Sequence, residues 1–117
     1  MDERSWTIPR IPLTNNKTLR MHWAARRKDG RDWHRAIGAI CGNGNAPGRI
    51  ELEITVHRVR LQDPDNAVAS LKPVIDALNR HGWMTDDDCA GLNLVAAQMK
   101  CKKADQRTEI TWKTMTE

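Results

Sequence analysis

Six of the chain's fifteen acidic residues fall within positions 63–88, which read DPDNAVASLKPVIDALNRHGWMTDDD. Asp63 and Asp65 flank a proline, and Asp86, Asp87 and Asp88 follow after about the length of one helix. Carboxylates brought close together repel one another, and a hard divalent cation with oxygen ligands relieves that repulsion. If a strand–helix–strand unit returns the chain to its starting point, these side chains form a Mg²⁺ or Mn²⁺ site. Such a site could activate water and neutralise charge on a phosphodiester.

Lys72 is the lysine between the two acidic groups, and it lies four residues before Asp76. On a helix this spacing puts the two side chains on one face. The lysine could steady the negative charge of the site or offset charge on a phosphate as the bond breaks. The alternative is an ordinary surface ion pair, which contributes little to stability.

Other interpretations of the acidic residues compete with a metal site. Asp-Pro-Asp-Asn is also a good turn sequence, and residues 86–88 could form a solvated or helix-capping loop. A calcium-binding EF-hand loop is excluded, because the fifth, sixth and twelfth positions from Asp63 are Ala67, Val68 and Val74. Zinc is disfavoured, since the histidines and cysteines show no paired ligand spacing.

The first part of the chain predicts a strand followed by a helix. Residues 5–8 favour a short strand that Pro9 and Pro12 close. Asn15-Asn16 is expected to form a polar turn. Apolar residues recur at helical spacing over 22–41, with Gly30 expected to weaken or interrupt the helix, and the loop 42–48 ends it.

The strand that positions Asp63 and Asp65 is predicted over 49–61, where apolar and polar residues alternate. The alternation slips by one residue after His57, which indicates a bulge. If the chain stays extended beyond it, both carboxylates leave the strand in one direction.

The remaining elements are a helix and two strands. Apolar residues over 67–81 mark one helical face, with the regular helix expected to begin near 70–72, Pro73 in its first turn and Gly82 closing it. Residues 92–102 and 108–114 are expected to form a hairpin. The order β-α-β-α-β-β predicts a single α+β domain over 1–117, with a mixed sheet and helices.

Composition limits the class of protein. The chain has 117 residues, enough for one core, and no run of eighteen apolar residues that could span a membrane. Its N-terminus is acidic and broken by proline, unlike a signal peptide. The three cysteines are odd in number and far apart, which favours free thiols and a cytoplasmic protein.

Charge and aromatic residues suggest a polyanionic partner. Residues 10–35 contain eight lysines and arginines against two aspartates, and such a basic surface attracts phosphates. Mere solubility is the alternative explanation. Trp6, Trp33 and Trp112 are expected to fill the core, whereas Trp23 and Trp83 could instead stack on exposed bases.

The stretch DPDN…LKPVIDAL…HG…DDD resembles the RusA family of Holliday junction resolvases, found in bacterial and phage genomes. The shared features are an Asp-x-Asp-Asn, a lysine four residues before Asp-Ala-Leu, a glycine and a pair of aspartates. The early segment PRIPLTNN (9–16) resembles the family's proline-then-asparagine element. The chain departs from the family in being about three residues longer between Asn66 and Lys72 and in carrying the extra Asp88.

The resemblance implies a RusA-like fold and a homodimer that binds four-way DNA junctions. It implies paired nicks made with Mg²⁺ or Mn²⁺ in recombination and repair, and no small-molecule cofactor. The implied catalytic residues are Asp63, Asp65, Asp87 and Lys72, with Asp86 as a further metal neighbour. We expect phosphates to be held by the basic N-terminal region, namely Asn15, Asn16, Lys17, Arg20, Arg26, Arg27 and Lys28. The alternatives are a non-catalytic junction-binding or replication accessory protein, and a nuclease acting on flaps or other branched DNA.

Overall fold

A computed structural model describes residues 2–46, 48–85 and 92–115. A strand followed by two helices occurs twice, and two further strands complete the chain. In chain order they are β1 (Glu3–Ile8), α1 (Asn15–Arg20), α2 (Trp23–Ile40), β2 (Ile50–Arg58), α3 (Pro64–Ala69), α4 (Lys72–Arg80), β3 (Leu92–Lys100), the 3₁₀ turn η1 (Lys103–Asp105) and β4 (Arg107–Thr114).

The four strands form one mixed sheet in the order β1-β4-β2-β3. β4 is antiparallel to both β1 and β2, whereas β2 and β3 are parallel and pair from Ile50–Leu92 to Arg58–Lys100. The α+β class and the mixed sheet are therefore confirmed. The predicted hairpin is wrong, because β2 lies between β3 and β4. The two candidate strands have similar alternation, and that pattern does not say which neighbour each one pairs with.

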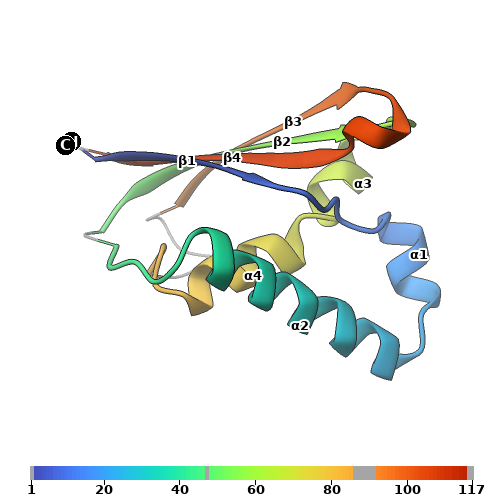
Figure 1. Cartoon of the computed structure of the whole chain (residues 1–117), viewed down its shortest axis with the longest axis horizontal. Coiled ribbons are helices and arrows are strands. Elements are labelled where there is room, and N and C mark those ends of the chain that lie inside the picture. Colours follow the sequence, from blue (N-terminus) through green and yellow to red (C-terminus); the bar gives the residue numbers. More distant parts are fainter. Residues whose placement is uncertain (1, 47, 86–91, 116–117) are drawn as a thin grey trace.

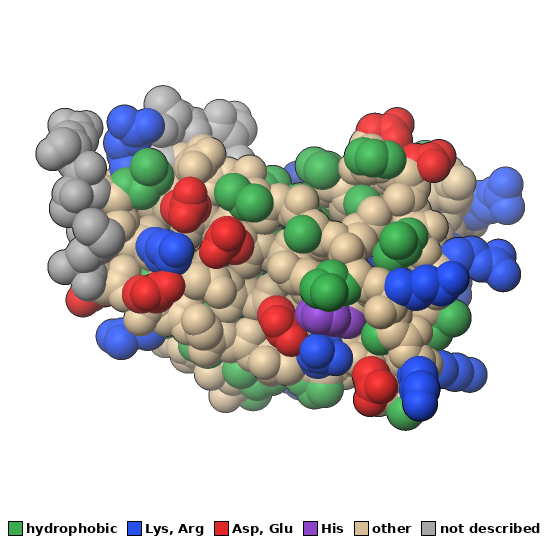
Figure 2. Space-filling model, turned by 90° about the horizontal axis from the view of Figure 1, so that it is seen from above, with side chains coloured by type: hydrophobic (Ala, Val, Ile, Leu, Met, Phe, Trp, Pro, Cys, Tyr) green, Lys and Arg blue, Asp and Glu red, His purple; other side chains and the backbone are tan. Residues whose placement is uncertain are grey.

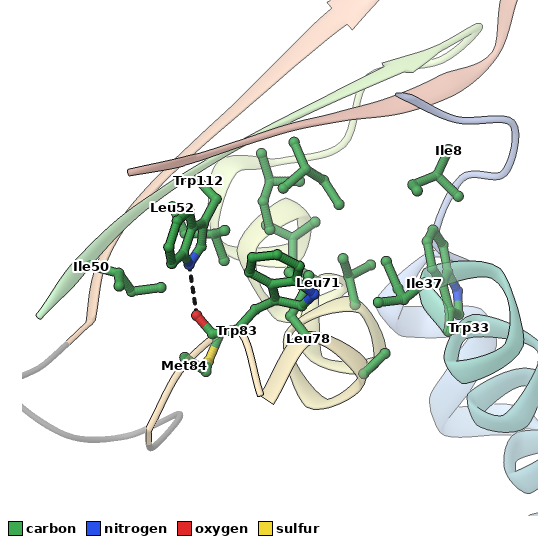
Figure 3. Close-up of a cluster of buried hydrophobic side chains, with 14 of the residues drawn as sticks. Ile8, Trp33, Ile37, Ile50, Leu52, Leu71, Leu78, Trp83, Met84 and Trp112 are labelled. Atoms are coloured by element: carbon green, nitrogen blue, oxygen red, sulfur yellow. Dashed lines mark hydrogen bonds between the residues drawn. The ribbon is translucent and has the colours of Figure 1, made fainter. Parts of the chain in front are cut away.

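The helices cover one face of the sheet and leave the other face open (Figure 1). The core lies between the layers, where Ile50, Leu52, Ile54 and Val56 of β2 are buried as their alternation predicts. They meet side chains of α2 and α4, and Figure 3 shows several of these residues packed together. The helical contribution comes from Trp33, Ile37, Leu71, Val74, Ala77 and Leu78.

Two local predictions for the first helical region are wrong. Asn15-Asn16 begins α1 instead of forming a turn, because the Thr14 side chain accepts a hydrogen bond from the Lys17 N–H and caps the helix. Gly30 does not interrupt α2, which runs unbroken over eighteen residues. Packing of its apolar face against the core outweighs the modest helix-breaking tendency of one glycine.

The end of β2 also differs from expectation. The strand stops at Arg58, and Val59 and Leu61 are 42% and 49% exposed. The change of phase therefore marks the strand's end, and the predicted bulge and extended continuation are wrong. α3 begins at Pro64, since proline is pre-organised for the first helical turn.

The prediction for residues 67–81 is confirmed in its main point. α4 begins at Lys72 with Pro73 in its first turn, and Gly82 follows its end with a φ of 85°. Residues 67–69, the first part of the predicted stretch, belong instead to the separate short helix α3. Within the described residues, no helix is long and apolar enough to cross a membrane.

The described cysteines and tryptophans divide between buried and exposed positions. Cys41 and Cys101 are free thiols, and burial raises the pKa of Cys41 to about 12. Trp33 and Trp112 are buried and Trp6 packs against the core, as predicted. Trp83 is only 7% exposed, so the alternative that it stacks on bases is wrong, whereas Trp23 is 62% exposed.

Candidate functional site

Asp63 and Asp65 lie at the start of α3, directly beyond the end of β2. Asp63 is the N-cap residue but makes no side-chain capping bond, and Asp65 is in the first helical turn. Both are exposed, and neither carboxylate has a hydrogen bond or ion pair among the described residues. Two unpartnered carboxylates two residues apart are suited to holding a divalent cation through oxygen ligands.

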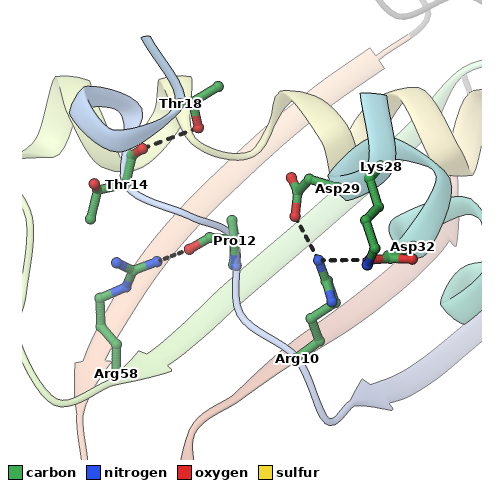
Figure 4. A network of polar contacts seen from close by, with 8 residues as sticks. All are labelled: Arg10, Pro12, Thr14, Thr18, Lys28, Asp29, Asp32 and Arg58. Atoms are coloured by element: carbon green, nitrogen blue, oxygen red, sulfur yellow. Dashed lines mark hydrogen bonds and ion pairs between the residues drawn. The ribbon is translucent and has the colours of Figure 1, made fainter. Parts of the chain in front are cut away.

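A buried arginine supports the turn that presents these aspartates. Arg58 is 4% exposed, and its Nη2 donates to the Pro12 carbonyl at 2.8 Å, as Figure 4 shows. The Gln62 amide, oriented with its oxygen toward the guanidinium, accepts from Nη1 at 2.8 Å and from Nη2 at 3.2 Å. Burial lowers the pKa of Arg58. Arg58 therefore links the N-terminal segment to the residue immediately before Asp63.

Gln98 fixes the same turn to β3. Its side chain accepts from the Gln62 N–H at 2.9 Å and donates to the Gln62 carbonyl at 2.8 Å. Sequence reasoning missed Arg58, Gln62 and Gln98. The only features in the sequence that could have pointed to them are the charged Arg58 at the end of a strand with a buried apolar face and Gln62 directly before Asp-Pro-Asp.

Lys72 lies on a different surface, in a groove of about 370 Å³ bordered by α1, α2 and the start of α4. Its Nζ is 3.5 Å from Asp76 Oδ1, so the surface ion pair that the sequence offered as the alternative role of Lys72 is present. Asn15 and Arg26 line the same groove. The structure thus brings together three of the predicted functional residues that are far apart in sequence. Asp63 and Asp65 do not line it.

His34 is a groove residue that the sequence analysis did not single out. Burial lowers the pKa of His34, and the neighbouring Arg80 and His81 lower it further, while Asp76 acts in the opposite direction. Its Nδ1 is buried without a hydrogen-bond partner among the described residues. The groove therefore combines an imidazole that resists protonation with an amide, cations and the carboxylates of Asp29 and Asp76.

The basic residues of α1 and α2 form an exposed surface beside the groove. No carboxylate of the described residues lies within ion-pairing distance of four of them, which are Lys17, Arg20, Arg26 and Arg27. Lys28 instead pairs with Asp32 at 3.0 Å, and that hydrogen bond lowers the pKa of Asp32. Asn16 is exposed at the start of α1. Unpaired cations are the residues able to hold phosphates.

Arg10 serves the structure instead. Its Nη2 donates to Asp29 Oδ1 at 2.6 Å and lies 3.9 Å from Asp32 Oδ2, and Figure 4 shows these residues. Its guanidinium also lies over the Trp33 ring. These contacts fasten the segment after β1 to α2.

Asp86 and Asp87, the other expected metal ligands, lie outside the described residues. The residues that border them lie where β2 begins: Leu92 pairs with Ile50, and the Trp83 carbonyl accepts from Trp112 Nε1. Asp63 follows Gln62, which is bonded to Gln98. The six residue steps from Leu92 to Gln98 correspond to about 20 Å of strand. A parallel crossover returns the chain to the start of the first strand and not to its end.

No three His, Cys, Asp or Glu side chains of the described residues come close enough together to hold an ion. Within one copy, the described part of the chain therefore offers two carboxylates at the start of α3 and a separate groove around Lys72.

The open face of the sheet carries mixed charges (Figure 2). Lys113 Nζ lies 3.7 Å from Glu3 and 4.0 Å from both Glu51 and Glu53. Lysine and arginine side chains gather at the right of this view, the end where η1 and α3 lie in Figure 1.

Comparison with known proteins finds no family model and no curated protein that matches this chain.

Proposed function

We propose that this chain is a Mg²⁺- or Mn²⁺-dependent endodeoxyribonuclease that resolves four-way DNA junctions by paired nicks, in recombination and repair. The observation that carries the proposal is the position of Asp63 and Asp65. They are exposed, they have no partner among the described residues, and the buried Arg58 with Gln62 supports the turn that carries them at the end of a strand. The resemblance of residues 63–87 to RusA supplies the substrate class.

Asp63 and Asp65 fit a divalent cation by their chemistry, since carboxylate oxygens are the ligands that Mg²⁺ and Mn²⁺ take. When bound, the ion would supply a Lewis acid and an activated water. The role of the two aspartates is to hold it at one end of β2. Arg58 and Gln98 restrain the turn so that the carboxylates stay in place.

Lys72 offsets negative charge on the DNA in this proposal. Its ion pair with Asp76 is long and its side chain is 75% exposed, so the pair is worth less than about 1 kcal/mol. Lys72 can therefore leave Asp76 for a phosphate at little cost. Asn15, Arg26 and the unpaired cations beside the groove hold the backbone without reading sequence.

A second copy of the chain would complete the site. β3 is an edge strand of nine residues without proline or glycine, and its one charge is the terminal Lys100. Val95 and Met99 on it are 42% and 55% exposed. Long uncharged edges of this kind readily pair with another strand, which supports a homodimer joined antiparallel through β3.

Antiparallel pairing of two β3 strands sets the start of one strand beside the end of the other. Leu92, at the start of β3 in one copy, would then approach the end of β3 and the turn before Asp63 in the partner copy. We therefore assign Asp87, with Asp86 beside it, to the metal site of the opposite copy. Two equivalent sites related by a two-fold axis suit a junction with approximate two-fold symmetry.

One observation favours a second candidate, a non-catalytic junction-binding protein. In a single copy, Asp63 and the borders of residues 86–91 lie at opposite ends of the strand pair. If the chain acts as a monomer, the DNA surface remains but the metal site has only two carboxylates. A nuclease for flaps or other branched DNA shares the site and differs in substrate.

Cleavage of labelled four-way junctions, flaps and plain duplex, with Mg²⁺, with Mn²⁺ and with chelator, separates these functions. The proposal expects paired nicks in the junction alone. Asp65→Asn should abolish cutting and leave junction binding intact, whereas Asp105→Asn removes another exposed carboxylate and should keep activity. Binding without cutting would identify the second candidate.

Mixing two inactive variants tests the shared site. If Asp65→Asn and Asp87→Asn are each inactive, mixed dimers contain one intact site when the site spans two copies, and single nicks should return. If each site is instead contained within one copy, both sites of the mixed dimer carry a substitution, and no activity should return.

A further inference from the structure

The corner where α1 meets α2 exposes an apolar and aromatic surface among cations. We call Leu19, His22, Trp23 and Arg27 the exposed corner. Leu19 and Trp23 are 66% and 62% exposed, the two largest values among the exposed large hydrophobic residues. Trp23 is the first residue of α2, and no acidic residue lies in the first turn of α1 or of α2.

Trp23 lies beside one guanidinium and one imidazole, and it takes no part in the core. The Arg27 guanidinium carbon lies 5.6 Å from the centre of the Trp23 ring, and the His22 ring lies 5.5 Å away at 35°. His22 is fixed in turn, because its Nδ1 accepts from the Ala24 N–H at 3.2 Å. The indole is thus restrained while most of it stays accessible.

The exposed corner continues into the groove around Lys72, since Leu19 borders both and Arg26 lies in the groove one turn from Trp23. Lys17 and Arg20 of α1 and Arg26 and Arg27 of α2 lie within a few residues of Leu19 and Trp23 in the chain, and none of the four has a carboxylate of the described residues within ion-pairing distance. An aromatic ring combined with unpaired guanidinium groups is suited to a ligand that carries both a flat ring and a phosphate. A nucleotide carries both.

We propose that Trp23 is a stacking platform for a nucleobase of the bound DNA that has lost a stacking neighbour, with Arg20, Arg26 and Arg27 holding its phosphates. This inference rests on the proposed function, because it takes DNA as the ligand. Bases inside a duplex are stacked on one another and offer no free face. The platform therefore selects nucleotides at a branch point or in a single strand.

Binding measured in chelator, where no cutting occurs, tests this platform. The probes are a short oligothymidylate, a four-way junction and an intact duplex. Trp23→Ala should weaken binding of the first two by about 5- to 150-fold, the range that one base–aromatic stack contributes. Trp23→Phe should keep most of the affinity, and binding to duplex should change little.

Two control variants show whether a loss of binding comes from lost stacking, from lost charge or from a general effect on the fold. Ile40→Ala removes another exposed apolar side chain, at the far end of α2, and should have no effect. Arg20→Ala should lower the salt dependence of binding by about one counterion, whereas Trp23→Ala should leave that slope unchanged.

Fluorescence provides a readout that does not depend on the alanine variant. Oligothymidylate should quench the accessible tryptophan emission of the wild type, and Trp23→Phe should lose this quenching while it still binds. Equal affinity of wild type and Trp23→Ala, equal weakening toward all three probes, or absent quenching would each overturn the platform. If the wild type cuts junctions in Mg²⁺ under any of these outcomes, the proposed nuclease function stands.

Discussion

Trp83 and Trp23 show how differently the molecule uses the same side chain. Trp6, Trp83 and Trp112 form an aromatic cluster with ring centres 4.8 and 5.2 Å apart in edge-to-face contact. Both buried indole N–H groups of this cluster donate. Trp83 donates to the Gly42 carbonyl, and Trp112 donates to the Trp83 carbonyl, as Figure 3 shows. At the exposed corner, by contrast, Trp23 is outside the core, and its ring lies beside the Arg27 guanidinium and the His22 imidazole.

The difference separates stability from binding. The aromatic cluster removes large apolar surfaces from water and satisfies their polar groups, which favours folding. The exposed corner and the groove keep an aromatic ring, several cations and the weakly paired Lys72 at the surface, which contributes little to stability and keeps them available to a ligand. Substitutions in the aromatic cluster should therefore change the free energy of unfolding most, and substitutions at the exposed corner should change it least.

Trp83→Ala should have the largest effect. Removing this buried indole leaves a cavity between Trp6 and Trp112 and should lower the free energy of unfolding by about 3–5 kcal/mol. Urea denaturation followed by circular dichroism measures this loss. Trp23→Ala is the matched control, expected to change stability by less than about 0.5 kcal/mol. Similar losses in the two variants would contradict the division between cluster and corner.

Arg58→Met should have the next largest effect. It leaves the Pro12 carbonyl without its buried donor, so we expect a loss of about 1–3 kcal/mol in the free energy of unfolding. Arg60→Met, which removes an exposed arginine two residues away, should be nearly neutral. In the proposed nuclease, Arg58→Met should also slow cutting more than it weakens DNA binding, because it frees the turn that carries Asp63.

Gly30→Ala should stabilise the protein. Gly30 lies inside α2, and a Cβ added there would meet nothing within 4 Å. Reducing the backbone freedom of the unfolded chain should add about 0.5–1 kcal/mol to the free energy of unfolding. Gly38→Ala in the same helix is the control, because its Cβ would come within 2.9 Å of the His81 ring and should destabilise the fold. The melting temperatures of both variants test this contrast.

His34 should make stability depend on pH by a smaller amount. Its folded pKa lies below the ordinary 6.5, so the unfolded chain takes up a proton that the folded chain resists. Stability should therefore fall as pH decreases below about 6.5 and gain nothing from His34 above it. Urea midpoints at about pH 7.5 and about pH 5.5 measure this slope. His34→Gln should flatten it, and an unchanged slope would remove His34 as its source.

Local patterns were sufficient to predict several elements. Alternation over Ile50–Val56 marked the central strand, and Pro73 with Gly82 marked the limits of α4, because these signals act over a few residues. The same patterns also indicated the α+β class. They could not show that Thr14 would cap α1, since the competing turn at Asn15-Asn16 uses equally good residues.

The candidate site was predictable in its residue types and only partly in its arrangement. The sequence alone identified exposed aspartates, an ion-paired lysine and a basic N-terminal region. Only the tertiary structure decided that β2 separates β3 from β4, that Arg58 and Gln98 support the turn at Asp63, and that Trp83 is buried while Trp23 is not. Strand pairing and burial depend on contacts between residues far apart in the chain. A periodicity of two or of 3.6 residues specifies which face is apolar but not what will cover it.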